Sequence, residues 1–173
     1  MKSKYVQYYV EGEDEVKLIN TLKTDLRVIQ PGKVQKLNVV ERLFTNARLM
    51  SLAPGTRVVL VFDTDTGHLD ILNQNLAILS RCSAISEIVT IPQVPNLEGE
   101  LIRSCGIKQI TQLLGSKSRE EFKSDLIRVS NLGSKLRAHH FDIKQFWSGT
   151  PASPYEQIKN QADMVKLLNR ESN

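Results

Sequence analysis

The stretch RVVLVFDTDTGHLDIL, residues 57–72, decides the fold class of this chain. Its apolar run, 58–62 (VVLVF), is short, continuous and rich in β-branched side chains, as expected for a strand buried on both faces. The run stops at Asp63 and Asp65, and residues from about 69 to 82 then show helical spacing. Because strands of this kind occur in parallel sheets covered by helices, the segment predicts an α/β fold.

The same alternation of strand and helix runs through the first hundred residues, and only helices are predicted after it. Strands are predicted at 4–10, 34–39, 58–62 and 87–92, and helices at 13–26, 39–52, 69–82, 97–105, 107–115, 119–129, 133–140 and 155–168. We therefore expect a Rossmann-like central parallel sheet flanked by helices over residues 1–100. Residues 101–173 are expected to form an α-helical C-terminal extension that packs on it as one structural unit.

The composition is that of a globular protein with a mildly basic second part. Residues 1–100 carry 11 Lys/Arg against 12 Asp/Glu, and residues 101–173 carry 12 against 7. This imbalance permits a polyanionic partner, although ordinary solvated helix faces explain it equally well. We expect the two cysteines, Cys82 and Cys105, to be small core residues. The sequence shows neither a membrane span nor a signal peptide. We expect a cytoplasmic protein without a membrane partner.

Acidic residues follow two of the predicted strands. Glu11 follows the first strand in VEGEDE, and Asp63 and Asp65 follow the third in VFDTDTG. Ligands of open parallel sheets gather at the carboxyl ends of the strands, so these three carboxylates are expected to converge. Such oxygen ligands suit Mg²⁺ or Mn²⁺, whose charge would offset the repulsion between the carboxylates. The alternative is that both aspartates are turn residues.

In this order and strand context, VEGEDE and VFDTDTG resemble the Toprim domain, the catalytic module of topoisomerases, primases and several nucleases. The Toprim signature is a glutamate, usually followed by glycine, and a later Asp-x-Asp pair. The resemblance covers roughly residues 4–100, and it implies a Toprim-like fold and nucleic-acid chemistry.

A finer resemblance is to the Toprim part of the overcoming-lysogenization-defect (OLD) nucleases. Glu15 matches an acid four residues after the first glutamate, and VPNLEGEL matches a later acidic motif, with Glu98 as the best match and Glu100 as an alternative or helper. A lysine completes that pattern, and Lys135 in NLGSKLR is the candidate. Glu11, Asp63 and Asp65 would then hold one divalent ion, and Glu15 with Glu98 would hold or assist a second.

These residues lead us to expect a Mg²⁺-dependent nuclease, with Mn²⁺ as a substitute, that hydrolyses DNA or RNA in antiphage defence. Lys135 or Arg137 would offset charge on the phosphate and contact nucleic acid. A topoisomerase or primase is expected less, because the chain shows no room for DNA gates and no zinc-binding module.

Two alternatives come from other classes. The chain contains no G-x-x-x-x-G-K-[ST] motif, so it would lack the ATPase half of OLD-like enzymes. It would then be a silent or partner-gated Toprim subunit that acts with a separately encoded ATPase, and a homo-oligomer is also compatible with the sequence. The second alternative is a small-ligand phosphotransfer domain, which is disfavoured because Glu11 stands where such enzymes place an aspartate nucleophile.

Overall fold

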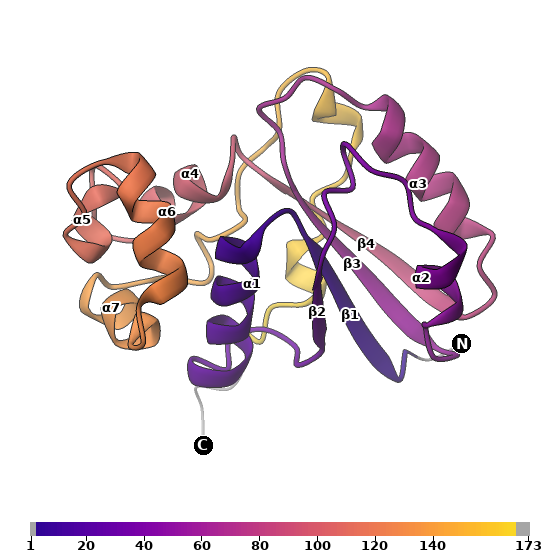
Figure 1. Cartoon of the computed structure of the whole chain (residues 1–173), viewed down its shortest axis with the longest axis horizontal. Helices are drawn as coiled ribbons and strands as arrows, with labels where there is room; N and C mark the ends of the chain where they lie inside the picture. The colour runs from indigo at the N-terminus through magenta and orange to yellow at the C-terminus, as the bar shows by residue number, and fades with distance from the viewer. Residues whose placement is uncertain (1–2, 169–173) are drawn as a thin grey trace.

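A four-stranded sheet forms the central layer of the protein, and all of its strands are parallel (Figure 1). The computed structural model describes residues 3–168. The strands are β1 (Tyr5–Val10), β2 (Lys33–Lys36), β3 (Thr56–Asp63) and β4 (Ile85–Gln93), in the order β2-β1-β3-β4. With helices on both faces, this sheet confirms the expected α/β class and a Rossmann-like arrangement.

The helices lie on both sides of the sheet. One face is covered by α1 (Glu13–Asn20), which continues into the π-helical turn η1 (Thr21–Asp25), and the other by α2 (Asn46–Met50) and α3 (Asp70–Ser80). After β4 the chain forms α4 (Leu97–Ser104), α5 (Thr111–Leu114), α6 (Arg119–Arg128) and α7 (Leu132–Ala138). Figure 1 shows α5, α6 and α7 gathered beside α1, away from α2 and α3.

The apolar run of β3 is continuous because both of its faces are buried. Val59 and Val61 join the core under α1, whereas Val58, Leu60 and Phe62 join the core under α3. Successive side chains of a strand point to opposite faces, so a strand with two buried faces has no position for a polar residue.

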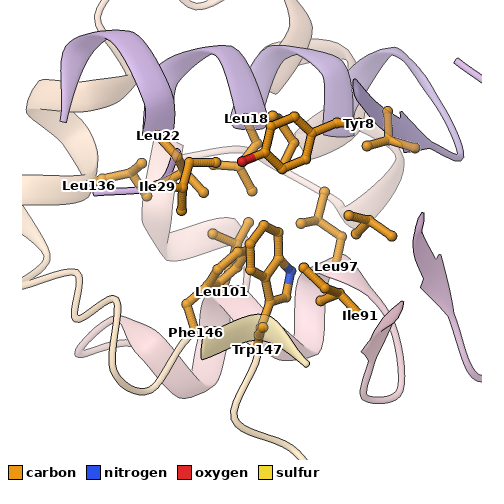
Figure 2. Packing of buried hydrophobic residues seen from close by; sticks show 14 of the residues in the cluster. Tyr8, Leu18, Leu22, Ile29, Ile91, Leu97, Leu101, Leu136, Phe146 and Trp147 are labelled. Carbon is orange, nitrogen blue, oxygen red and sulfur yellow. The ribbon is translucent and has the colours of Figure 1, made fainter. Parts of the chain in front are cut away.

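One hydrophobic core joins the sheet to the helices that follow it. Tyr8 of β1, Leu101 of α4, Leu136 of α7 and Trp147 belong to the same buried cluster (Figure 2). The predicted division at residue 100 falls inside α4. The helices after β4 therefore share their buried surface with the strands.

The predicted helix at 155–168 is wrong. This segment contains only two 3₁₀ turns, η2 (Tyr155–Gln157) and η3 (Ala162–Met164). Between them, Gln161 pairs with the edge of β4: its N–H donates to the carbonyl of Thr90 at 2.9 Å, and its side-chain oxygen accepts from the Thr90 N–H at 3.0 Å. Because these bonds cover an open sheet edge, they favour an extended chain over the helix that the apolar spacing predicts.

The predicted helix at 39–52 is also mostly wrong, since only α2 forms within it. The buried side chain of Asn75 donates to the carbonyls of Val39 and Arg42, and it accepts from the N–H of Phe44 at 2.9 Å. These bonds satisfy backbone groups that a helix would otherwise have paired, so the segment remains a loop. The predicted helix at 107–115 shortens to α5 for residues 111–114.

Candidate metal centre

The ends of β1 and β3 bring carboxylates together because these strands are neighbours in the sheet. Glu11 directly follows β1, and Asp63 is the last residue of β3. The connection from β1 leads to β2 on one side, and the connection from β3 leads to β4 on the other. The order of the strands therefore reverses between β1 and β3, which is where open α/β sheets bind their ligands.

Three carboxylates form a compact triad at this point. Glu11, Glu15 and Asp63 each offer one oxygen, and these oxygens all lie within 4.8 Å of one another. Two ligand oxygens on opposite sides of one Mg²⁺ lie about 4.2 Å apart, so a small adjustment would let the triad hold such an ion. The residues present thus fit a hard cation with oxygen ligands, and the geometry does not distinguish Mg²⁺ from Mn²⁺.

Burial and mutual repulsion make the triad a poor place for unneutralised negative charge. Burial, a hydrogen bond with Asp14 and the charges of Asp14 and Asp63 raise the pKa of Glu15 to about 9. Burial and the charge of Glu11 raise the pKa of Asp63 to about 8, against a lowering by the hydrogen bond from Gln93. Burial, followed by the charge of Asp65, also raises the pKa of Glu11. Protons or a cation must therefore balance this cluster near neutral pH.

The start of α1 holds Glu15 in place. Its carboxylate accepts a hydrogen bond of 2.9 Å from the N–H of Gly12, the residue that precedes the helix. A Cβ atom at Gly12 would lie 2.8 Å from Oδ1 of Asp14 and 3.3 Å from Oε2 of Glu15. Glycine at this position therefore lets the backbone approach the carboxylates closely.

The structure groups the acids differently from the prediction, in which Glu11, Asp63 and Asp65 hold one ion and Glu15 with Glu98 hold or assist a second. Glu15 joins Glu11 and Asp63, whereas Asp65 lies in the exposed bend after β3 and accepts a hydrogen bond of 3.1 Å from Nδ2 of Asn96. Asp65 still acts electrostatically on Glu11, so it remains a near neighbour of the triad.

Glu98 lies beside this cluster, but it is engaged by a cation of the protein. Its buried carboxylate accepts from Nε of Arg119 at 2.9 Å and also from Nη2 of the same guanidinium. Arg119 begins α6, and its side chain is 68% exposed. The outer partner of this ion pair is therefore in contact with water, whereas the Glu98 carboxylate is buried.

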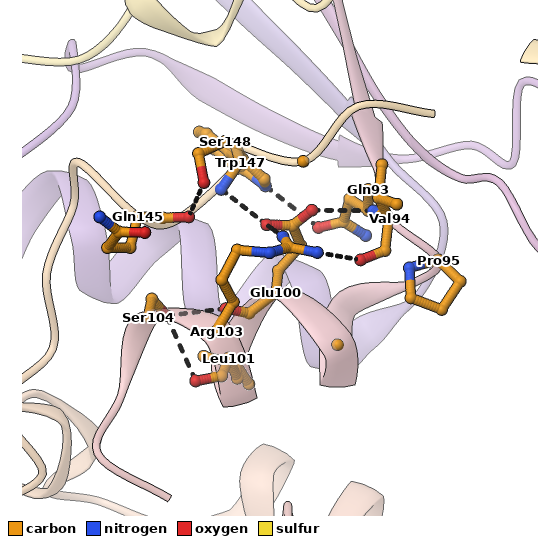
Figure 3. Close-up of polar contacts among 12 residues, drawn as sticks. Gln93, Val94, Pro95, Glu100, Leu101, Arg103, Ser104, Gln145, Trp147 and Ser148 are labelled. Atoms are coloured by element: carbon orange, nitrogen blue, oxygen red, sulfur yellow. Dashed lines mark hydrogen bonds and ion pairs between the residues drawn. The ribbon is translucent and has the colours of Figure 1, made fainter. Parts of the chain in front are cut away.

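Glu100, the alternative to Glu98, occupies a structural position instead. Its fully buried carboxylate accepts from the N–H groups of Val94 and Trp147, each at 2.8 Å, and from Nη1 of Arg103 at 2.6 Å (Figure 3). All three donors belong to the protein itself. Glu100 is not part of the triad, and its carboxylate links the start of α4 to the segment that contains Trp147.

A cavity of about 860 Å³ opens over the triad and contains five of the predicted ligands. Glu11, Glu15, Asp63, Asp65 and Glu98 all line it. Asp14 and Glu41 also line it, together with five basic residues: Lys36, Arg42 and Arg48 on the side of β2 and α2, and Arg119 and Lys123 on the side of α6. Within residues 3–168, Arg42, Arg48 and Lys123 take part in no ion pair with a carboxylate.

Lys135 and Arg137 do not line this cavity. Both belong to α7, and Nη2 of Arg137 donates to the carbonyl of Asp25, which ends η1 at the opposite end of the α1–η1 helix from Glu11. Arg119 and Lys123, which were not predicted as site residues, line the cavity instead. Their spacing of four residues on a predicted helix was a signal that the two share one face, but nothing in the sequence placed that helix beside α1.

No helix within residues 3–168 is long and apolar enough to cross a membrane. Comparisons with protein families, with curated proteins and with solved structures found no match to this chain. Its distinguishing chemical feature is an acidic triad, at the switch in strand order of a parallel sheet, that fits a metal ion.

Proposed function

We propose that this chain is a metal-dependent nuclease of the Toprim type, which hydrolyses phosphodiesters of DNA or RNA with Mg²⁺ or Mn²⁺. The observation that supports this most is the convergence of Glu11, Glu15 and Asp63 at the carboxyl ends of neighbouring parallel strands. A divalent cation held there would supply Lewis-acid activation of a phosphodiester.

Each acidic residue has a distinct task in this proposal. Glu11, Glu15 and Asp63 bind the cation through oxygens that are already close together. Asp65, at the rim of the same cavity, orients the entering nucleophile or completes the ligand set. Glu98 assists a second ion after it separates from Arg119.

The basic residues around the cavity suit a phosphate backbone. The acidic triad lies between Lys36, Arg42 and Arg48 on one side and Arg119 and Lys123 on the other. A nucleic-acid strand that crosses the cavity would place successive phosphates against both sides and one phosphodiester over the triad. Phosphate contacts of this kind provide affinity without reading the base sequence.

Cleavage assays test this function directly. The purified chain is incubated with supercoiled plasmid, linear DNA and structured RNA in the presence of Mg²⁺, Mn²⁺ or a chelator. We expect metal-dependent cutting that disappears in Glu11→Gln and Asp63→Asn. Asp70→Asn, an exposed acid in the first turn of α3 that does not line the cavity, is the matched control and should keep its activity. Cutting that survives both site substitutions would refute the proposal.

A second candidate is a partner-gated Toprim subunit in an antiphage system, and the Glu98–Arg119 ion pair favours it. With Glu98 engaged, only part of the predicted ligand set faces the triad. A separately encoded ATPase that contacts α6 would withdraw Arg119 and complete the site. Under this reading the isolated chain binds Mn²⁺ through the triad but does not cut. Robust cutting by the isolated chain would exclude it.

A further inference from the structure

The side chain of Gln93 connects the triad to a distant part of the chain. Gln93 is the last residue of β4, is 1% exposed and lies opposite Asp63 in the strand register. Its Nε2 donates a hydrogen bond of 2.7 Å to Oδ1 of Asp63. The metal-facing carboxylate of Asp63 is therefore held by a buried neutral donor.

The other end of the same amide contacts Trp147. The indole Nε1 donates to Oε1 of Gln93 at 3.2 Å (Figure 3). An indole nitrogen can only donate a hydrogen bond, and a carboxylate that is ionised to bind a cation can only accept one. The amide must therefore turn its oxygen to Trp147 and its NH₂ group to Asp63, so Trp147 fixes the orientation of Gln93.

Trp147 is itself firmly held. Its backbone N–H donates to the carboxylate of Glu100, and its backbone carbonyl accepts from Nδ2 of Asn160 at 2.8 Å. Its side chain is 1% exposed and packs against Phe146 with ring centroids 4.7 Å apart. The Glu100 carboxylate thus positions Trp147, Trp147 positions Gln93, and Gln93 contacts Asp63.

We propose that Gln93 is a positioning residue for metal binding by Asp63, and that Trp147 acts through Gln93 to fix the orientation of its amide. This inference rests on the proposed function, because it requires the triad to bind a cation. Without the Gln93 donor, Asp63 would rotate away from the like charge of Glu11, and the ligand oxygens would separate. Hydrogen-bonding partners of metal ligands commonly contribute in this way.

Calorimetric titration of the metal-free full chain with Mn²⁺, at one fixed pH, tests the proposal. In Gln93→Met, which keeps the side-chain length but lacks the donor, we expect Mn²⁺ affinity to fall by about 10- to 100-fold. Trp147→Phe keeps an aromatic ring but lacks Nε1–H, and we expect a smaller loss because the freed amide adopts both orientations. The double variant should bind no more weakly than Gln93→Met, because Trp147 acts only through Gln93.

A matched control separates positioning from general stability. Thr90→Val removes another buried side-chain hydrogen bond from β4, to the carbonyl of Lys159, and should lower the melting temperature without changing Mn²⁺ affinity. If Gln93→Met does not fold, Gln93→Asn replaces it, since the shorter amide withdraws from Asp63. The same loss of affinity is expected there.

The outcomes distinguish the two proposals. Absence of Mn²⁺ binding by the unsubstituted chain would refute the metal site and with it the proposed function. Wild-type binding that is unchanged in the folded Gln93 variant would overturn only the positioning role of Gln93. Additive losses in the double variant would overturn the claim that Trp147 acts through Gln93.

Discussion

Glu100 and the triad are two places where this protein buries carboxylates, and it neutralises them in opposite ways. The Glu100 carboxylate is fully buried, yet it receives two backbone N–H groups and the guanidinium of Arg103. Glu15 is almost as buried, but one backbone N–H and a ring of other acids surround it. The protein provides the positive partner for Glu100, whereas the triad could hold a metal ion instead.

This contrast explains how buried acids can be sorted into structural and ligand-binding groups. A buried charge costs several kcal/mol unless it is paired and hydrogen-bonded. Where the fold supplies the partners, as at Glu100, the carboxylate holds two segments together. Where it does not, as at Glu15 and Asp63, burial and neighbouring acids raise the pKa, and a proton or a cation would relieve the repulsion.

The largest expected effect is the loss of stability when the structural carboxylate, Glu100, is replaced. Glu100→Ala leaves the N–H groups of Val94 and Trp147 without an acceptor and separates Arg103 from its partner, so we expect a loss of about 3–5 kcal/mol in the free energy of unfolding. Urea denaturation in chelator measures it. Glu15→Gln should change stability by less than about 1 kcal/mol at neutral pH, because glutamine resembles the protonated acid and retains the bond from Gly12. Equal losses in the two variants would contradict the contrast.

The next effect concerns metal binding. Glu11→Gln removes a direct ligand, so Mn²⁺ affinity should fall by more than the roughly 100-fold that loss of an outer partner can cost. Glu98→Gln should weaken affinity much less, because Arg119 already occupies that carboxylate. Titration calorimetry on folded variants measures both changes. If Glu98→Gln lost more Mn²⁺ affinity than Glu11→Gln, the metal would be bound elsewhere than at the triad.

The triad also predicts how stability changes with pH. Folding raises the pKa of Glu15 to about 9 and that of Asp63 to about 8. At any pH between the unfolded and the folded pKa values, the folded state therefore binds more protons than the unfolded state. In chelator, the contribution of the triad to stability should be greatest below the unfolded pKa values, about 4, and should be lost as pH rises through 8 to 9. Saturating Mn²⁺ should remove the decline. Thermal melts measured across this range with and without metal check the prediction, and a stability that rises with pH in chelator would contradict it.

The smallest effects test which basic residues face the substrate. Arg119→Gln and Lys123→Gln should each reduce the salt dependence of nucleic-acid binding by about one phosphate contact. Lys123→Gln should change stability by less than about 1 kcal/mol, whereas Arg119→Gln should cost more, because it leaves the buried carboxylate of Glu98 without its partner. Lys135→Gln and Arg137→Gln on α7 are charge-matched controls outside the cavity. Fluorescence anisotropy at several salt concentrations measures all four, and larger losses in the α7 pair would show that nucleic acid follows another path.

Much of the site could be predicted because it depends on local order along the chain. An apolar run that ends in an acid predicts a buried strand with a carboxylate at its end, wherever the strand lies in the sheet. The positions of Glu11 and Asp63 follow from such runs, and both residues belong to the triad. Glu15 was predicted as a ligand of a second ion, but the first turn of α1 places it with the other two.

The predictions from sequence were wrong or incomplete where contacts between distant residues override the local hydrophobic pattern. Apolar spacing over 155–168 is compatible with a helix, but pairing of Gln161 with Thr90 at the β4 edge favours an extended chain. The roles of Glu98 and Glu100 could not be separated either. Both lie in the first turn of α4. Only their partners distinguish them: Arg119 on α6 for Glu98, and Trp147 in the loop after α7 for Glu100.

A parallel α/β sheet with carboxylates at the ends of its strands follows from the residue pattern alone, because hydrophobic periodicity and strand ends are properties of neighbouring residues. Tertiary packing sets which carboxylates meet, which one the protein neutralises for itself and which basic side chains line the cavity. Those outcomes depend on strand order and on helices packed from distant parts of the chain, which residue spacing does not encode.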